Sequence, residues 1–500
     1  MRDNLHSRRR GRRGAQRSPR SLPPRSPLAT PTARPSGSRR GTRAAQCRAG
    51  VVCYKPPHEE DLAVSEDPKS PREARRLERL RHGSQATRDV SPRPRPVLRA
   101  PPVLGSVGGG DEPTVAISKR GLERLNQGHV WIYRSDVAVP GGLQGGEVVR
   151  IADERGWFVG KAFYGKQSQI TLRLLTRQEE PIDDEFFARR IARARALREA
   201  ALPDPDRRRA QRLVHGEADF LPGLVVDRYA DCLSIQTLIE ATDARRDLFA
   251  TLLQQELQPR AIVERNDART RTYEGLELRK GMLRGEAPGP VEFLEGDVAL
   301  SADLLEGQKT GAFLDQAENR VEAGRYARGR ALDCFTYGGA FALQLARRAA
   351  TVTAVDISED AAELGRKAAA CNGAGNVRFV VANAFDLLSD EAEKGERYDT
   401  IVLDPPAFTR TKGAIEPALR GYKEINLRAF QLLAPGGVLV TCSCSFHIDD
   451  AAFEAVVLSA ASDAKRSVQV IERRGAAKDH PSLLGVAETR YLKCLILRVA

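Results

Sequence analysis

Two cysteines at the end of a predicted strand are the first candidates for chemistry. Cys442 and Cys444 follow the apolar run GGVLVT. A thiolate there can add to carbon 6 of a pyrimidine, which makes carbon 5 nucleophilic enough to take a methyl group from a sulfonium donor. Cysteines on buried strands also serve as small apolar side chains, and this alternative applies to both residues. Because both lie at the same strand end, we expect one of them to be catalytic.

A second candidate is the motif Asp404-Pro405-Pro406-Ala407-Phe408, which follows the apolar run IVL. The two prolines fix the backbone directly after a strand and so hold the carboxylate and nearby carbonyls where a planar base can dock. Phe408 is available to stack on that base. An ordinary turn explains the prolines but not their position after this strand. We therefore expect Asp404 and Pro405 to take part in catalysis.

A third candidate is a cofactor site made by two consecutive strand ends. The first reads Asp333-Cys-Phe-Thr-Tyr-Gly338-Gly339, where small residues let the backbone approach a ligand closely. The next strand ends roughly 20 residues later in Asp356, whose carboxylate can accept hydrogen bonds from ribose hydroxyls. Ser358 should cap the helix that follows. Either aspartate alone is explained as a plain strand end, but the spaced pair predicts a cofactor.

A repeated strand, turn and helix pattern predicts the fold that brings these motifs together. After Leu305 the runs ALDCF, TVTAVD, VRFVVAN, YDTIVLD and GGVLVTCSCS alternate with helical segments, and two more strands are expected near 468–473 and 490–499. Such βαβ units build a doubly wound, largely parallel sheet, whose ligands lie beyond the carboxyl ends of the strands. All three candidate motifs fall at such ends.

Two smaller modules are expected before this α/β domain. Short strands with glycine-rich turns between 114 and 177 predict a small β-barrel. After a charged helical stretch, strands around one helix predict an α+β middle domain. The expected divisions are a tail at 1–110, a β-barrel domain at 114–185, a middle domain at 186–300 and the catalytic domain at 301–500.

Composition excludes several classes of protein. With 41% hydrophobic and 29% charged residues, and no apolar run long enough for a bilayer, the chain is not expected to be a membrane enzyme. Its eight cysteines include no CxxC pair or Cys/His cluster with zinc-finger spacing, which predicts reduced thiols, a cytoplasmic location and no metal. Of the net charge of +13, residues 1–110 contribute 25 basic and 9 acidic groups. The remaining 390 residues hold 54 basic and 57 acidic groups, so the pI does not indicate a nucleic-acid-binding body.

At these motifs the sequence resembles the bacterial large-subunit ribosomal RNA cytosine-5 methyltransferases of the RlmI type, over about residues 114–500. The first module is similar to a PUA domain through RLNQGHVWIYRSDV and GWFVGKAFYGKQSQITLRLL. The middle segment resembles the family through DFLPGLVVDRY and IVERND, and the run QKTGAFLDQAENR leads into a Rossmann-like class I methyltransferase domain. The shared order of these segments makes the resemblance specific.

The resemblance implies S-adenosyl-L-methionine as methyl donor, a flipped cytosine in RNA, expected to be large-subunit ribosomal RNA, as substrate, and 5-methylcytosine as product. It also implies that Cys444 is the nucleophile and that Asp404 to Pro406 form the turn that holds the target base. The cofactor-binding set that it implies comprises Phe313, Asp315, Arg320, Asp333, Phe335, Tyr337, Gly338, Gly339, Asp356, Ile357, Asn383, Ala384 and Asp404.

Two positions depart from the expected pattern. Asn383 stands where an aspartate is expected to read the adenine amino group, although an amide oxygen can still accept that hydrogen bond. Ala407 follows the proline pair where a related group of enzymes has a second cysteine, so the group that removes the carbon-5 proton is not identified. The alternatives are a methyltransferase of the same fold that acts on a purine nitrogen and a non-catalytic RNA-binding assembly factor. A homodimer also stays open.

The tail is rich in Arg, Pro, Ser and Gly, and its lack of hydrophobic periodicity predicts disorder over 1–110. We interpret it first as a dispensable extension or a misassigned start. A basic arm that helps to hold RNA and an organellar transit peptide are the other two interpretations.

Overall fold

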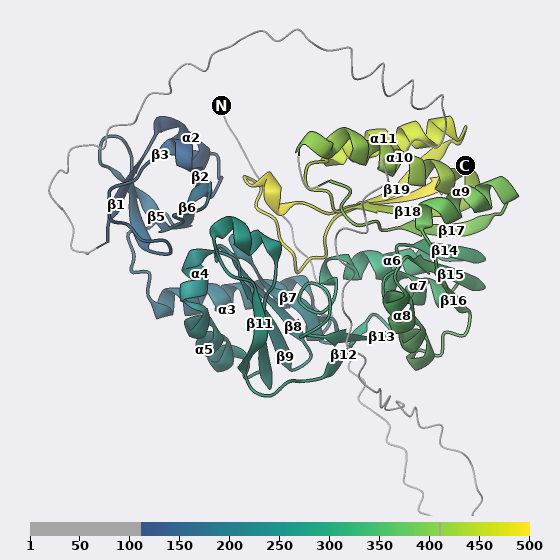
Figure 1. Ribbon diagram of the computed structural model, residues 1–500, viewed down its shortest axis with the longest axis horizontal. Helices are drawn as coiled ribbons and strands as arrows, with labels where there is room; N and C mark the ends of the chain where they lie inside the picture. Colours follow the sequence, from purple (N-terminus) through teal and green to yellow (C-terminus); the bar gives the residue numbers. More distant parts are fainter. Residues whose placement is uncertain (1–111, 410–411) are drawn as a thin grey trace, which may run out of the picture. The chain divides into compact units, whose positions relative to one another are not determined.

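The computed structural model describes residues 112–409 and 412–500 (Figure 1). The prediction of a disordered tail over 1–110 lies outside the described residues. Within these two ranges the strands form four sheets, of six, five, two and seven strands. No helix in the described part of the chain is long and apolar enough to cross a membrane.

The first sheet, which has the strand order β2-β6-β5-β4-β1-β3, forms the β-module expected from the sequence. Its core includes Val115, Ile132, Val149 and Leu172, all fully or almost fully buried. These apolar residues drive the segment to fold as strands around one core because β-branched side chains fit a pleated, half-buried surface. The elements are β1 (Thr114–Ile117), α2 (Lys119–Asn126), β2 (Trp131–Tyr133), β3 (Val137–Ala138), β4 (Val148–Ala152), β5 (Phe158–Tyr164) and β6 (Ile170–Thr176).

The middle sheet has five strands in the order β11-β10-β9-β8-β7. Helices α3 and α5 contribute to the core on one of its faces, where the ring of Phe187 lies 5.4 Å from that of Phe186 and 5.3 Å from that of Phe249. The elements are α3 (Asp184–Ala201), β7 (Ala210–His215), β8 (Leu224–Tyr229), β9 (Cys232–Thr237), α4 (Glu240–Ala244), α5 (Arg246–Leu257), β10 (Ala261–Asn266) and β11 (Arg279–Arg284).

The segment VEFLEGDVALSAD lies outside the five-stranded middle sheet. It forms a separate antiparallel hairpin of β12 (Pro290–Glu295) and β13 (Val298–Asp303), which pair only with each other. Val291 and Phe293 of the hairpin pack with Tyr229 and Val263 of the five-stranded sheet. The hairpin therefore packs against that sheet through side chains and adds no strand to it.

The last sheet has seven strands in the order β16-β15-β14-β17-β18-β20-β19. The first five are parallel and the last two antiparallel, which confirms the expected largely parallel α/β domain. Its strands are β14 (Arg330–Cys334), β15 (Thr351–Asp356), β16 (Val377–Val381), β17 (Tyr398–Leu403), β18 (Leu433–Ser443), β19 (Val468–Arg474) and β20 (Lys493–Val499).

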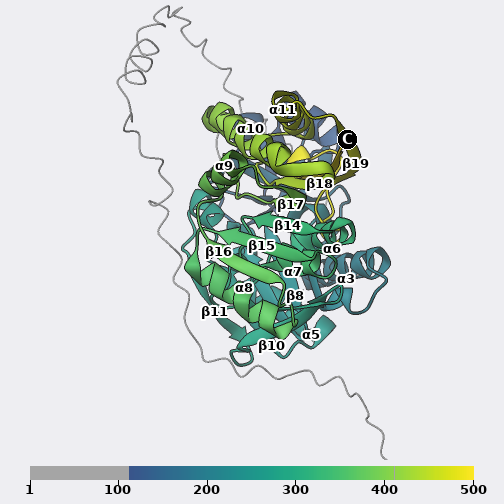
Figure 2. The same ribbon diagram turned by 90° about the vertical axis from the view of Figure 1, so that its right-hand side faces the viewer.

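Helices cover both faces of this sheet (Figures 1 and 2). One core lies under α9 to α11 and the other under α6 and α7. Ser358 caps α8 as predicted, since its hydroxyl accepts a hydrogen bond from the Ala361 amide. The helices are α6 (Ala317–Tyr326), α7 (Ala340–Ala346), α8 (Glu359–Cys371), α9 (Ala384–Lys394), α10 (Ile415–Leu432) and α11 (Asp450–Asp463).

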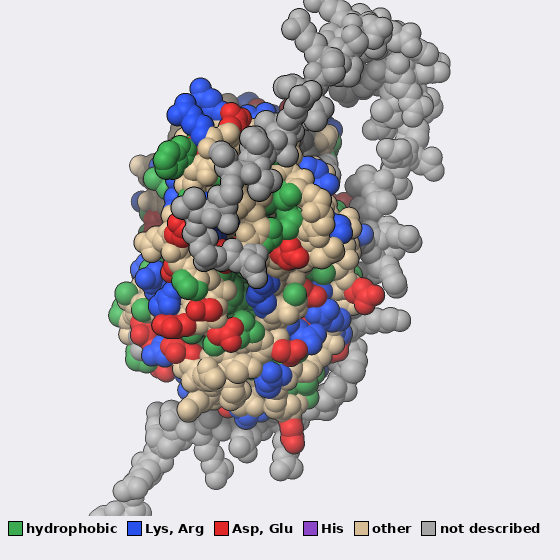
Figure 3. Space-filling model, turned by 90° about the vertical axis from the view of Figure 1, so that its left-hand side faces the viewer, with side chains coloured by type: hydrophobic (Ala, Val, Ile, Leu, Met, Phe, Trp, Pro, Cys, Tyr) green, Lys and Arg blue, Asp and Glu red, His purple; other side chains and the backbone are tan. Residues whose placement is uncertain are grey.

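Charges of both signs are interspersed on the face of the molecule that Figure 3 shows. This agrees with the near balance of basic and acidic residues after the tail. That face therefore offers no uniform basic field to a polyanion.

Candidate active site

The carboxyl ends of β14 and β15 lie side by side and hold the predicted cofactor loop. Asp356, at the end of β15, accepts hydrogen bonds from the amides of Tyr337 (2.8 Å) and Ser358 (3.0 Å). The carboxylate thus holds the loop after β14 and the start of α8 at once. Free lone pairs on its two oxygens can still accept from ribose hydroxyls.

The loop after β14 has an unusual backbone. Phe335 and Tyr337 have φ angles of 64° and 49°, and Gly339 has φ 80°. Non-glycine residues seldom adopt this region, and such strain concentrates at ligand sites. A Cβ at Gly339 would lie 2.8 Å from the ring of Phe379, so only glycine fits there without a shift. The backbone at this loop can therefore approach a ligand closely.

The side chains around this loop fit the chemical groups of S-adenosylmethionine. Asp333 is fully buried, and one of its oxygens accepts from Thr336 and the Ala342 amide, whereas the other has no partner among the described residues. Burial, with Asp404 and Asp356 nearby, raises the pKa of Asp333 to about 7. An ammonium group would satisfy the unpartnered oxygen and restore its ionised form.

Side chains at the ends of β15 and β16 suit the ribose and adenine of S-adenosylmethionine. Ile357, directly after Asp356, is 62% exposed, and Val381 at the end of β16 is 41% exposed. Exposed apolar side chains at strand ends can cover one face of a flat ring. Asn383 is the N-cap of α9, and its oxygen accepts from the Phe385 amide at 2.9 Å. A second lone pair remains for an adenine amino group, and Ala384 is buried beside it.

The predicted residues of the 308–320 segment are held in ion pairs. Arg320 is buried in a double ion pair with Glu295, at 2.7 and 2.5 Å, and also donates to the Phe313 carbonyl. Asp315 accepts from Lys309 at 3.0 Å and from Tyr491 at 2.6 Å. Burial opposes ionisation of Asp315, but Lys309 and the other donors hold its pKa well below its usual range.

The adjacent ends of β17 and β18 bring the two catalytic candidates together. Leu403 pairs with Thr441, and beyond them the Cys444 sulfur lies 3.9 Å from the Pro405 carbonyl oxygen. Burial raises the pKa of the Cys444 thiol to about 11, as does Asp404, whereas Lys309 opposes the shift. Burial and Asp315 raise the pKa of Asp404 to about 6. The site therefore places a thiol beside a carboxyl group that titrates near neutral pH.

Comparison with known proteins gives the family of this fold and site. A PUA-like domain matches residues 115–177 and a methyltransferase domain matches residues 327–477. Ribosomal RNA large subunit methyltransferase I of Tolumonas auensis is 41% identical over 393 residues, which are 77% of this chain and 99% of that protein. The protein of the same name from Shewanella denitrificans is 40% identical over 390 residues, 76% of this chain and 98% of its own. The chain belongs to the ribosomal RNA large subunit methyltransferase I family.

Solved structures agree on the fold of this chain. A candidate methyltransferase complexed with SAH has a TM-score of 0.67 at 20% identity, covering 77% of this chain and all of its own. A candidate SAM-dependent methyltransferase from Streptococcus mutans has a TM-score of 0.66 with the same coverage. These findings confirm the predicted family, the PUA-like and C-terminal methyltransferase domains, and S-adenosylmethionine as cofactor.

The two candidate cysteines have different surroundings. Cys442 is fully buried and pairs in register with Cys494 of β20, inside the apolar core under α6 and α7. Cys444 lies two residues further, past the end of the strand, and is only partly buried. The packing interpretation therefore suits Cys442, and Cys444 is the thiol at the edge of the sheet.

Several residues that support this site were missed from the sequence. The Tyr422 hydroxyl of α10 hydrogen bonds with the hydroxyls of Ser443 and Ser445, which flank Cys444, at 3.0 and 2.9 Å. Gln316 donates to Asp404 at 2.8 Å. Tyr422 is far from the motifs in sequence, and no spacing rule links it to them. Gln316 lies within the run QKTGAFLDQAENR, but nothing in that run indicates its contact with Asp404. Phe408 lies 4.6 Å from the Tyr422 ring, so part of its surface is used in packing.

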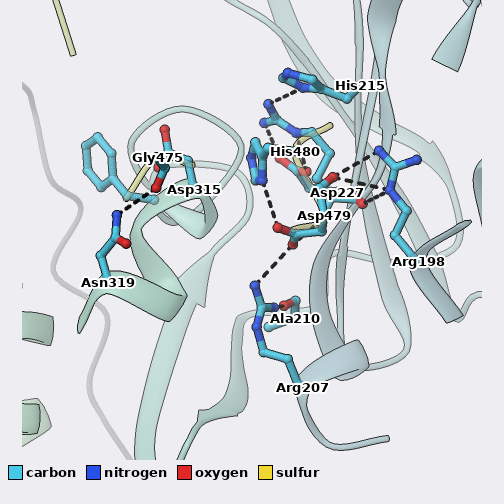
Figure 4. Close-up of polar contacts among 12 residues, drawn as sticks. Arg198, Arg207, Ala210, His215, Asp227, Asp315, Asn319, Gly475, Asp479 and His480 are labelled. Atoms are coloured by element: carbon cyan, nitrogen blue, oxygen red, sulfur yellow. Dashed lines mark hydrogen bonds and ion pairs between the residues drawn. The ribbon is translucent and has the colours of Figure 1, made fainter. Parts of the chain in front are cut away.

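The connection between β19 and β20 reaches the middle domain (Figure 4). The Asp479 carboxylate accepts from Arg207 and from the Arg212 amide, and its carbonyl accepts from the fully buried Arg198. His480 contacts the other oxygen of Asp479 at 2.8 Å. Figure 4 shows Arg207 and His480 beside Asp479, so one loop residue joins α3, β7 and the segment between them to the methyltransferase domain.

The same connection also reaches the site and the first module. The Ala477 amide donates to the Asp315 carbonyl at 2.8 Å. Val486 is fully buried in the core of the first module with Val115 and Ile132. We call residues 475–492 the connecting loop.

No group of three or more His, Cys, Asp or Glu side chains that could hold a metal occurs in the ranges 112–409 and 412–500.

Asp356 supplies a direct test of the cofactor loop. Asp356→Ala removes the acceptor for the amides of Tyr337 and Ser358 and for the ribose. Affinity for S-adenosylmethionine should therefore fall about tenfold or more, which is roughly 1–3 kcal/mol of binding free energy. Isothermal calorimetry on the full chain measures this change. Asp386→Ala, in the first turn of α9, is the matched control and should bind normally. Unchanged affinity in Asp356→Ala would remove this residue from the cofactor site.

Proposed function

We propose that this chain methylates carbon 5 of a cytosine in large-subunit ribosomal RNA through a covalent adduct with Cys444. Its relatives at about 40% identity are named ribosomal RNA large subunit methyltransferases, which supports the class of RNA. The PUA-like module at 115–177 supports RNA binding. The cofactor-binding residues that we propose are those predicted from the sequence, with Asp333, Asp356 and Ile357 best suited by their surroundings.

The observation that carries the proposal is the position of Cys444 beside the Asp404-Pro405 turn, with sulfur 3.9 Å from the Pro405 carbonyl. A ring or exocyclic nitrogen has a lone pair of its own and needs no thiolate. Carbon 5 of cytosine lacks one until a nucleophile has added to carbon 6. A partly buried thiol at the base-binding edge therefore favours carbon methylation over nitrogen methylation.

The assigned residues account for the addition to carbon 6 and for the binding of the cytosine ring. S-adenosylmethionine supplies an electrophilic methyl group. The Cys444 thiolate forms a bond to carbon 6, and the electron pair of the 5,6 double bond becomes available at carbon 5. Carbon 5 takes the methyl group as the bond between that group and the sulfonium sulfur breaks. The carbon-5 proton then passes to a base outside the assigned residues, which restores the double bond and expels the thiolate. Asp404 is placed to accept a hydrogen bond from the cytosine amino group while the ring is held at the turn.

Analysis of the methylated nucleoside tests this proposal. The purified chain should convert unmodified large-subunit ribosomal RNA to a product whose digest contains 5-methylcytosine, measured by mass spectrometry with labelled S-adenosylmethionine. Small-subunit ribosomal RNA is the control and should stay unlabelled. Label in a methylated purine would contradict the cytosine assignment and favour a nitrogen-methylating enzyme. No label in either RNA would contradict catalysis on ribosomal RNA.

A further inference from the structure

A buried lysine lies next to the nucleophile and has no part in the reaction derived above. Lys493 is the first residue of β20 and pairs in register with Ser443. It is 3% exposed. Lysine is almost never buried to this extent without a partner, because transfer of its charge out of water is costly. The surroundings of Lys493 therefore need an explanation.

The Lys493 ammonium is held by backbone carbonyls rather than by a carboxylate. Its nitrogen donates to the carbonyl oxygens of Ser445 at 2.7 Å and Tyr491 at 2.8 Å. Burial lowers the pKa of Lys493 to about 8, against the opposing effects of Asp450 and Cys444. At neutral pH the lysine is thus still mostly charged, and this charge lies at the residue that follows Cys444.

Cys444 needs a nearby positive charge. Burial and Asp404 raise its pKa, and Asp315 adds to the shift, so a thiolate there forms against two carboxylates. Two lysines act in the opposite direction, and Lys309 has a larger effect than Lys493. Lys309 is 43% exposed and is paired with Asp315, so solvent and this partner screen its charge. Lys493 is buried and is fixed by two acceptors.

We propose that Lys493 is a positioning residue that fixes the strand end carrying Cys444 and stabilises the thiolate that Cys444 forms. Its bond to the Ser445 carbonyl restrains the backbone directly after the nucleophile, while Tyr422 restrains the serine side chains on both sides. The inference rests on the proposed function, because it assigns a role to Lys493 through Cys444. The charged groups that face this pair are Asp315, Asp404, Lys309, Asp449, Asp450 and Arg490.

The test measures thiol reactivity in the full chain without RNA. Alkylation of Cys444 by iodoacetamide is followed by peptide mass spectrometry, with the exposed Cys371 as internal reference. Removing the charge in Lys493→Met should slow Cys444 alkylation near pH 7 about tenfold, with Cys371 unchanged. Lys423→Met removes a lysine that is paired with Asp463 and should change neither rate. An unchanged Cys444 rate in Lys493→Met overturns the inference.

A second variant keeps the test decisive if Lys493→Met does not fold. In the unsubstituted chain, Lys493 loses its charge as the pH rises through about 8, and the thiolate of Cys444 then loses this stabilising charge. A plot of the logarithm of the Cys444 alkylation rate against pH should therefore have a slope below one above that pH. Lys493→Arg keeps its charge throughout, and the slope should return to about one. Equal slopes in the two proteins contradict the inference.

A failure of the Lys493 inference can be distinguished from a failure of the proposed function. Trapping with RNA that carries 5-fluorocytosine reports on Cys444 as nucleophile, whereas alkylation reports on its coupling to Lys493. A normal adduct with no Lys493 effect on alkylation overturns this inference alone. An absent adduct with the Lys493 effect intact overturns the proposed function and with it the catalytic role of the coupling.

Discussion

Cys444→Ser should abolish methyl transfer, with turnover lowered by about a thousandfold or more. A serine hydroxyl is a far weaker nucleophile than a thiolate, so addition to carbon 6 fails and carbon 5 stays unreactive. RNA carrying 5-fluorocytosine gives the sharper measurement. Fluorine replaces the proton that must leave, so the adduct should persist after methylation and map to Cys444 by peptide mass spectrometry.

Cys442→Ser is the matched control for this experiment. Cys442 is fully buried against Cys494, and its substitution should affect stability more than catalysis. The adduct should therefore form in Cys442→Ser and be absent in Cys444→Ser. An adduct that maps to Cys442 would show that the nucleophile is two residues from its assigned place. Normal methylation by Cys444→Ser would exclude the cytosine-5 mechanism.

Asp404→Asn should lower turnover about a hundredfold, because the amide cannot supply the charged acceptor at the base-binding turn. The substitution should also remove the dependence of the methylation rate on ionisation of Asp404. The raised pKa of Asp404, about 6, means that its carboxylate is lost as the pH falls through that value. In the unsubstituted enzyme, the rate should depend on ionisation of the thiol alone above about pH 6, and on ionisation of both the thiol and the carboxylate below it. A plot of the logarithm of the rate against pH should therefore become steeper below about pH 6. Asp404→Asn should lack this change of slope.

Thiol reactivity separates a direct role of Asp404 from an effect on Cys444. Asp404 raises the pKa of the Cys444 thiol, so Asp404→Asn should make alkylation of Cys444 faster while methyl transfer becomes slower. Asp399→Asn, on the same strand, is the control, because Asp399 accepts from the Arg330 amide at the opposite edge. Slower alkylation in Asp404→Asn would mean that the substitution disturbs the nucleophile itself.

The strands of the parallel sheet, and the ends at which the candidate motifs lie, followed from local patterns in the sequence. Apolar runs that end in Asp356 or in Asp404 and Pro405 are strands of the parallel sheet, and strand ends of such a sheet meet at one edge. Ser358 could be predicted as a cap because a cap depends on residues only three positions apart. Local signals of this kind need no knowledge of the tertiary fold.

The residues that surround Cys444 could not be predicted, because they come from segments that are distant in the sequence. Tyr422 and Lys493 reach the Cys444 strand end from α10 and β20, and nothing in their own neighbourhoods marks them. The β12–β13 hairpin shows a similar limit, because the alternation that predicts its two strands does not show that they pair only with each other. Alternation shows that a segment is a strand, but the choice of its neighbour is made by packing across the fold.

The connecting loop also bears on the order in which the protein can assemble during synthesis. Val486 completes the core around Val115, yet it lies close to the carboxyl terminus. N-terminal domains generally fold first as the chain emerges from the ribosome. Here the first module keeps an unfilled apolar space until the chain has been made as far as Val486. The PUA-like module and the strand end that carries Cys444 thus reach their final state at nearly the same point of synthesis, because residues 475–492 directly precede β20.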